Sequence, residues 1–262
     1  MVNGLLESWH VVSFPWAKKL GFMLKIEDVV DRILNAGYVV EVEKSIVEMA
    51  QGARTDYLKV MPTLRIHAPL ERFSSKDLEN GPWRKFAIGS ANGLGDPYAQ
   101  LLQTTYFHEN NVGTPYLNAL FSTLISTRNR ILETREDFGS HPERDQFWNA
   151  CRIHHYPRGG GFMVEHNDTH FPSVLASAGV PFLQVMALLS TKGVDFQTGG
   201  SFVINGEGTR TYLEDSCPLG AVVMFDGSIR HGVTDVDPDQ VLDFNLASGR
   251  IAAFVNLYQV LR

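Results

Sequence analysis

Two histidines and one aspartate are spaced in this sequence like the ligands of a metal ion. One residue separates His166 from Asp168, and His231 follows further along the chain. On an extended strand, residues i and i+2 point to the same face, so His166 and Asp168 could bind one ion together. A histidine from a neighbouring strand would complete a two-histidine, one-carboxylate facial triad. That set leaves coordination positions open and is typical of non-haem Fe(II) oxygenases.

A second triplet, His141-Pro142-Glu143, has the same ligand spacing but a better structural interpretation. Ser140 and Glu143 match the Ser-x-x-Glu capping box, and Pro142 suits the first turn of a short helix. We therefore predict a helix start at this position rather than a metal site.

Four motifs accompany the predicted ligands in a fixed order. They are RIHHYPRGGGFMVEHND (152–168), TGGSF (198–202), VVMFD followed by HGV (222–226 and 231–233), and GRIAAFV (249–255). Together they resemble the iron site of the 2-oxoglutarate-dependent dioxygenases, most closely the prolyl-hydroxylase-like branch. In that branch a strand tyrosine and a Gly-rich loop precede the His-x-Asp pair, as Tyr156 precedes His166 here. The resemblance covers about residues 150 to 258, and the first 140 residues resemble no particular subfamily.

The resemblance implies a ligand set and a mechanism. His166, Asp168 and His231 would hold Fe(II), 2-oxoglutarate would chelate it as cosubstrate, and O2 would take the last position. Arg250 would bind the distal carboxylate of 2-oxoglutarate, with Tyr156 also touching the cosubstrate. Arg250 follows His231 by a longer interval than is usual in the family. We interpret residues 235–247 as a surface loop inserted between paired strands.

Further residues are candidates for contact with the cosubstrate or substrate. Arg152 shares a strand face with Tyr156 and could face the substrate or pair with a carboxylate. Gln184 could touch the cosubstrate or substrate, or be an interior polar residue. His170 could imitate a helical zinc pair, but Pro172 disfavours a helix, so substrate contact or support of the site is the better interpretation. The carboxylate of Asp168 favours hydroxylation, desaturation or cyclisation over halogenation, because halogenating relatives lack it.

Hydrophobic periodicity indicates which elements position these residues. Residues Ile26–Ala36 carry a helical stripe that Gly37 ends, and a strand follows from Tyr38. A second helix is predicted from Thr114 as N-cap and Pro115 as first residue. The stretch Ser74–Pro97 is predicted to be irregular. The predicted strands of the second half are Cys151–Tyr156, Phe182–Ser190, Ser201–Ile204, Ala221–Phe225 and Ile251–Tyr258.

These elements predict a mainly β fold with helical support (α+β). The expected core is a double-stranded β-helix (jelly-roll), with helices packed on one sheet. We expect a single oxygenase domain over residues 1–262. Within it, about 1–145 would form a helical and mixed support region, and about 147–262 the jelly-roll core with the metal site.

Composition excludes several classes of protein. The 262 residues include 23 basic and 29 acidic side chains, a formal charge of −6, and no basic stripe, so no nucleic-acid partner is expected. No apolar run is long enough to span a membrane. The two cysteines, Cys151 and Cys217, are most simply buried thiols. The amino-terminal residues do not resemble a signal peptide. We expect a cytoplasmic protein, and the oligomeric state is left open.

The predicted activity is oxidation of a small molecule, such as an amino acid or a natural-product intermediate, with release of succinate and CO2. Three alternatives remain open. One is a peptidyl or protein hydroxylase with the same mechanism. Another is a non-oxidative zinc hydrolase that uses the same three ligands and leaves Arg250 without a role. The last is a catalytically silent jelly-roll binding module.

Overall fold

Antiparallel strands are the main elements of this computed structural model, which describes residues 25–67, 75–91, 98–111, 113–168, 175–176 and 179–260. The helices are α1 (Ile26–Ala36), α2 (Lys44–Val60), α3 (Pro115–Ile131) and α4 (Pro142–Asp145), with 3-10 helices η2 (Met61–Thr63) and η3 (Ser75–Asn80). The strands are β1 (Tyr38–Glu41), β2 (Arg65–Ile66), β3 (Trp83–Ala91), β4 (Tyr98–Phe107), β5 (Phe147–Tyr156), β6 (Gly161–His166), β7 (Leu183–Leu188), β8 (Gly200–Ile204), β9 (Arg210–Tyr212), β10 (Val222–Asp226), β11 (His231–Val236) and β12 (Arg250–Gln259).

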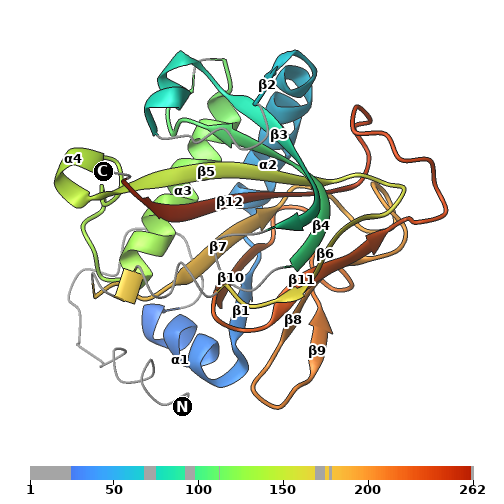
Figure 1. Ribbon diagram of the computed structural model, residues 1–262. Helices are drawn as coiled ribbons and strands as arrows, with labels where there is room; N and C mark the ends of the chain where they lie inside the picture. The colour runs from blue at the N-terminus through green and yellow to red at the C-terminus, as the bar shows by residue number, and fades with distance from the viewer. Residues whose placement is uncertain are drawn as a thin grey trace.

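The described strands belong to one sheet, and the order of neighbours explains how it curls. That order is β1-β10-β7-β12-β5-β4-β6-β11-β8-β9, with β3 paired to β4 and β2 paired to β3 in parallel. β4 pairs with β5 through residues 103–107 and with β6 through residues 100–101, so the sheet turns at this strand. Figure 1 shows the curl, with β4 between the long strands β5 and β12 and the shorter β6 and β11.

The helices cover one face of the sheet. Side chains of α1, α2 and α3 pack in one apolar cluster with residues of β5, β7, β10 and β12, and Figure 1 shows α2 and α3 behind the long strands. In β5, Cys151 and Ile153 belong to this cluster. The alternate residues Arg152, His154 and Tyr156 line a cavity inside the curl. The period-2 alternation of a strand therefore gives β5 one face in the core and one in the cavity.

Most elements predicted from hydrophobic periodicity are confirmed. α1 ends as expected at Gly37, whose left-handed φ of 82° lets its N–H bond the Ile33 carbonyl. α3 begins at Pro115 after Thr114. The five predicted strands correspond to β5, β7, β8, β10 and β12 within two residues, except that β5 begins earlier, at Phe147. Within the described chain, no helix is both long enough and apolar enough to cross a membrane.

Two local predictions are wrong. The stretch Ser74–Pro97 contains η3 and β3, in addition to residues 92–97, which lie outside the described ranges. β3 pairs with β4 and the very short β2, and side chains such as Ile88 (65% exposed) reach solvent, so it lacks the apolar run of a central strand. The capping box is also absent, although the helix start predicted there is confirmed, with Pro142 in the first turn of α4. α4 has His141 as N-cap, with no side-chain cap, and Ser140 instead donates a hydrogen bond to Glu109.

The long interval before Arg250 contains a loop, but that loop does not join paired strands. β11 extends to Val236 and pairs with β6 and β8, whereas β12 pairs with β5 and β7. Residues 237–249 therefore cross from one part of the curl to another. Gly159 in the β5–β6 turn supports this crossing, because a Cβ there would lie 2.5 Å from the backbone nitrogen of Leu242. Arg158 of the same turn pairs with Asp237.

Candidate metal centre and active site

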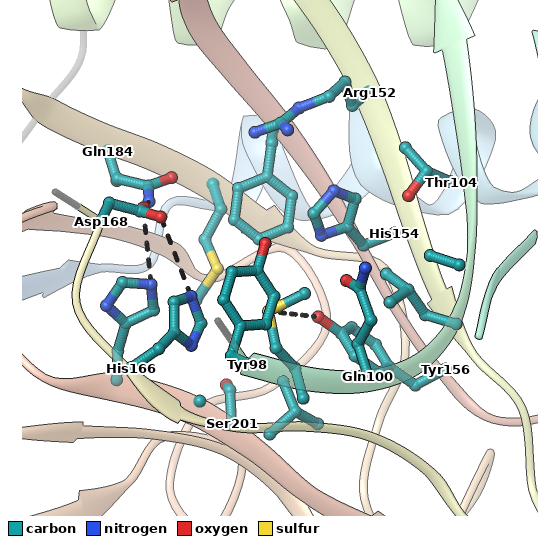
Figure 2. Close-up of a pocket in the computed structure, with 18 of the residues that line it drawn as sticks. Tyr98, Gln100, Thr104, Arg152, His154, Tyr156, His166, Asp168, Gln184 and Ser201 are labelled. Atoms are coloured by element: carbon teal, nitrogen blue, oxygen red, sulfur yellow. Dashed lines mark hydrogen bonds and ion pairs between the residues drawn. The ribbon is translucent and has the colours of Figure 1, made fainter. Parts of the chain in front are cut away.

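The three predicted metal ligands meet at one end of the cavity. His166 is the last residue of β6 and His231 the first of β11, and the two are direct cross-strand partners. Asp168 faces both imidazoles, with distances of 3.8 Å from Oδ1 to His166 Nε2 and 3.7 Å from Oδ2 to His231 Nε2 (Figure 2). The three donor atoms lie within 4.8 Å of one another. They form the one such ligand group found in the described residues.

Hydrogen bonds to the backbone fix which nitrogen of each histidine can bind a metal. Nδ1 of His166 lies 2.8 Å from the Val164 carbonyl oxygen, and Nδ1 of His231 lies 2.8 Å from that of Ile229. A carbonyl only accepts, so Nδ1 carries the proton in both rings and Nε2 offers its lone pair toward Asp168. Burial, together with the neighbouring His231, lowers the pKa of His166 and favours the neutral form that a metal requires.

The position of Asp168 in the backbone differs from the prediction that it shares a strand face with His166. β6 ends at His166, so Asp168 lies beyond the strand rather than on its face. The intervening Asn167 donates a hydrogen bond to the Ser228 carbonyl oxygen at 2.7 Å and ties the segment to the turn before β11. Two residues past the strand, the chain thus turns Asp168 toward both histidines.

A chain of amides supports the carboxylate from behind. Gln184 on β7 donates from Nε2 to Asp168 Oδ2 at 2.6 Å, as Figure 2 shows. Asn256 on β12 donates in turn to Gln184 Oε1 at 3.1 Å. Gln184 lines the cavity, as the sequence suggested for a cosubstrate or substrate contact. Its described hydrogen bonds nevertheless go to the metal-ligand carboxylate and to Asn256.

The three predicted metal ligands open onto a cavity of about 460 Å³ inside the curled sheet. A pocket of this volume suits a small organic molecule. Among its described lining residues, Asp168 is the one acidic side chain, whereas Lys85, Arg152 and Arg250 are basic.

Arg250 and Tyr156 lie together at one end of the cavity. They are cross-strand partners of β12 and β5, and the guanidinium carbon lies 5.3 Å from the centroid of the tyrosine ring. Arg250 donates from Nε to Glu214 at 2.7 Å and from Nη2 to Ser201 Oγ at 3.0 Å. Its Nη1 is buried without a hydrogen-bond partner among the described residues. Nε and Nη2 thus hold the guanidinium in place, while the Nη1 donor remains available.

Arg152 lies further along the same face of β5. It donates from Nη1 to the Tyr258 hydroxyl at 2.7 Å, and its guanidinium lies over the rings of Tyr258 and Phe254. His154 lies between Arg152 and Tyr156 (Figure 2). Burial, and then the two arginines on either side, lower the pKa of His154 well below its usual value. This imidazole is therefore neutral at physiological pH.

The neighbouring His155 faces the opposite way. It bonds Tyr57 on α2 (Nδ1–Oη 3.3 Å) and the Ser248 carbonyl oxygen (Nε2–O 3.0 Å). These contacts connect β5 to the helices and to the loop before β12. His170, the remaining sequence candidate, lies outside the described residues.

Comparison with known proteins identifies the fold. No protein-family model matches the sequence, and no curated protein resembles it in sequence. A solved prolyl-4-hydroxylase from Pseudomonas putida aligns with a TM-score of 0.56 at 12% identity, over 89% of this chain and 98% of its own. This chain has the fold of the prolyl hydroxylases.

Two further solved structures share the prolyl-hydroxylase fold with this chain. A prolyl hydroxylase from Trichoplax adhaerens, in complex with a hypoxia-inducible-factor peptide fragment, aligns with a TM-score of 0.51 at 12% identity over 89% of both chains. IDO from Bacillus thuringiensis aligns with a TM-score of 0.50 at 11% identity, over 90% of this chain and 97% of its own. The resemblance to prolyl hydroxylases that the sequence indicated is thus confirmed at the level of the fold, at 11–12% identity.

Within this prolyl-hydroxylase fold, sequence reasoning missed two side chains at the site. Tyr98, the first residue of β4, stacks on His166 with ring centroids 4.3 Å apart. Burial, then the charge of Asp168, raise its pKa to about 12, so the phenol is protonated. Glu214 follows β9 and is buried against Arg250. In the sequence it stands beside Asp215 and looks like part of a solvated turn.

Proposed function

We propose that this protein is an Fe(II)- and 2-oxoglutarate-dependent oxygenase that oxidises a small molecule. One observation carries the proposal. His166, Asp168 and His231 converge at one end of a cavity that also contains a buried arginine with an available donor. The shared fold with prolyl hydroxylases supports this assignment.

The donor set suits ferrous iron. Two imidazoles and one carboxylate form the facial arrangement that non-haem Fe(II) oxygenases use. Gln184 and the backbone carbonyls orient these ligands, as supporting groups do around protein metal sites. With iron and 2-oxoglutarate bound, such a site activates O2 and oxidises the substrate, releasing succinate and CO2.

The residues around Arg250 would hold the distal carboxylate of 2-oxoglutarate. Nη1 is the available donor, and Tyr156 presents its ring beside the guanidinium. Burial raises the pKa of Tyr156, so its hydroxyl stays protonated and able to donate. Glu214 and Ser201 fix the guanidinium from its other side, so little ordering would be needed when the dicarboxylate binds.

We also propose that the sheet is a double-stranded β-helix and that residues 1–262 form one domain. The second proposal is supported by an apolar cluster that joins α1, α2 and α3 to β5, β7, β10 and β12. β1 and β4, from the first part of the chain, are strands of the same sheet. The free, buried thiols of Cys151 and Cys217 fit a reducing compartment such as the cytoplasm.

An anaerobic titration tests the proposed function. Fe(II) and then 2-oxoglutarate are added to metal-free protein while the visible charge-transfer band of the iron chelate is recorded. The band should appear with wild type and with His141→Ala, a control at an exposed histidine. It should be absent with His166→Ala, and Arg250→Met should require a higher concentration of 2-oxoglutarate.

Other results would favour the alternatives. Iron binding without the band, together with hydrolysis that needs neither O2 nor 2-oxoglutarate, would replace the oxygenase by a zinc-type hydrolase. If wild type binds no metal, the catalytically silent binding module would be the favoured alternative. Succinate release that peptides stimulate and small molecules do not would indicate a peptidyl hydroxylase.

A further inference from the structure

The cavity has a second arginine, well separated from the one that would bind the cosubstrate. Tyr156 pairs with Arg250 across the β5–β12 ladder, and Arg152 lies four residues from Tyr156 on the same face of β5. At about 3.4 Å per residue, the backbone of Arg152 is roughly 14 Å along the strand from Tyr156, the residue directly opposite Arg250. Across the sheet, Arg152 pairs with Phe254, two residues from the Asn256 that supports the metal ligands through Gln184. Arg152 is therefore closer than Arg250 to the metal-ligand end of β12.

Arg152 is surrounded by groups that position it without neutralising its charge. Its described neighbours are the side chain of Tyr106, which hydrogen-bonds it, the hydroxyl of Tyr258, and the rings of Tyr258 and Phe254. Its Nε is buried without a hydrogen-bond partner. No described carboxylate forms an ion pair with it. Arg250 differs, since it pairs with Glu214. Arg128, outside the cavity, is buried among amide and carbonyl oxygens.

Charge in the cavity favours an anionic ligand. Asp168 is the one acidic group among the described lining residues, and as a metal ligand it would be directed at the metal ion. A cationic substrate would therefore find no other described carboxylate in the cavity. Arg152, which forms no ion pair with a described carboxylate, would instead attract an anionic group.

We propose that the substrate is a small organic carboxylate whose carboxylate group binds Arg152. This inference rests on the proposed function and narrows it to one substrate class. The planar guanidinium fork matches a carboxylate in two parallel hydrogen bonds. The aromatic rings of Tyr258, Phe254 and Tyr98 provide apolar walls for the body of such a molecule. Bound in this way, the body of the substrate extends from Arg152 toward the metal ligands.

Direct binding to metal-free protein tests this proposal without relying on turnover. Calorimetric titrations would use 3-phenylpropanoate, its primary amide, and phenylethyl phosphate as probes. A charge-assisted pair with an arginine corresponds to a preference for the carboxylate over the amide of about 10- to 100-fold. Arg152→Met should abolish this preference, and Arg152→Lys, which keeps the charge but not the fork, should retain part of it. If Arg152→Met does not fold, the lysine variant alone still tests the claim.

Two further variants assign the binding site. Arg230→Met, at an exposed arginine, should bind all probes like wild type. Arg250→Met should weaken 2-oxoglutarate binding while the preference for the carboxylate probe persists. Arg152→Met should abolish the preference for the carboxylate probe while 2-oxoglutarate binding persists. Equal binding of the carboxylate and the amide to wild type would overturn the proposal, as would a preference that disappears in Arg250→Met but survives in Arg152→Met. Stronger binding of the phosphate than of the carboxylate would overturn the assignment to a carboxylic acid.

The titration with iron distinguishes this inference from the proposed function. If the protein prefers the carboxylate through Arg152 but gives no charge-transfer band, the anion site at Arg152 is supported and the oxygenase assignment is wrong. A protein that gives the band but shows no preference for the carboxylate remains an oxygenase, and Arg152 is then not the anchor of its substrate.

Discussion

Replacing Glu214 by glutamine should destabilise the free protein and strengthen its response to 2-oxoglutarate. The Glu214 carboxylate accepts hydrogen bonds from Arg250 Nε and from the amide and hydroxyl of Ser201, at 2.7 to 2.8 Å. The side chains of Arg250 and Glu214 are only 1% and 2% exposed. Removing one charge of a buried pair costs about 3–5 kcal/mol. Glutamine keeps the volume and one acceptor, so we expect a loss near the lower end, about 3 kcal/mol.

The assay compares thermal unfolding of anaerobic, Fe(II)-loaded wild type and variant, with and without 2-oxoglutarate. At roughly 2–4 °C per kcal/mol for a chain of this size, Tm should fall by about 6–12 °C without the cosubstrate. The distal carboxylate of 2-oxoglutarate would then supply the negative charge that Arg250 has lost. Its binding should therefore raise the Tm of the Glu214→Gln variant by more than that of wild type.

The control is Glu207→Gln, at an exposed glutamate in the β8–β9 turn, which should stay within about 0.5 kcal/mol of wild type. A Glu214→Gln variant as stable as wild type would show that Arg250 does not depend on this partner. An equal rise of Tm in both proteins would refute the placement of the cosubstrate carboxylate at Arg250.

Three further predictions follow from single contacts. Gln184→Leu removes the donor to Asp168 and should weaken Fe(II) binding about 10- to 100-fold in an anaerobic titration. Burial lowers the pKa of His155 to about 4, so only the unfolded chain takes up its proton between about pH 6.5 and 4. Its stabilising effect is present above that range, and the free energy of unfolding in urea should fall by about 2 kcal/mol from pH 7 to pH 5. Gly199→Ala should lose about 2–4 kcal/mol in the same assay, because φ is +83° and a Cβ would lie 2.2 Å from the Asp235 oxygen.

Each of these predictions has a contrary outcome and a reference variant. Unchanged iron affinity in Gln184→Leu, compared with Gln259→Leu at an exposed position of β12, would mean that the carboxylate needs no support. A His155→Gln variant that loses as much stability as wild type between pH 7 and pH 5 would assign the acid sensitivity to other groups. Full stability of Gly199→Ala, with Gly206→Ala as an unhindered reference, would show that the turn before β8 can adjust.

The grouping of His166, Asp168 and His231 could be predicted because its signal is local and repeated. A His-x-Asp pair, a Gly-rich approach and a strand that is followed after a short turn by a second histidine are each short patterns, and their order added information. The cross-strand pairing of His166 with His231 could then be anticipated. The sequence pattern assigned Asp168 to the same strand face. It could not show that β6 ends at His166 and that an irregular segment turns the carboxylate inward.

The groups that support these ligands were not predictable, because their contacts join distant parts of the chain. Glu214 reaches Arg250 across 36 positions, and Asn256 reaches Gln184 across 72. Neither contact produces a periodic pattern of residue types in the sequence. The strand that carries Tyr98 was missed for a related reason. Its neighbour β3 has a polar, partly exposed pattern, which resembles a loop until the pairing with β4 is known.

The alternation of side chains along β5 constrains how the length of this segment can change. Arg152, His154 and Tyr156 face the cavity, while Cys151, Ile153 and His155 face the helices. Deletion or insertion of one residue in this strand would exchange the two sets, so that charged groups would meet the core and apolar ones the cavity. Neighbours on both edges fix the pairing register as well. Length variation between homologues, and any loop engineered into this protein, should therefore occur outside β5 rather than within the strand.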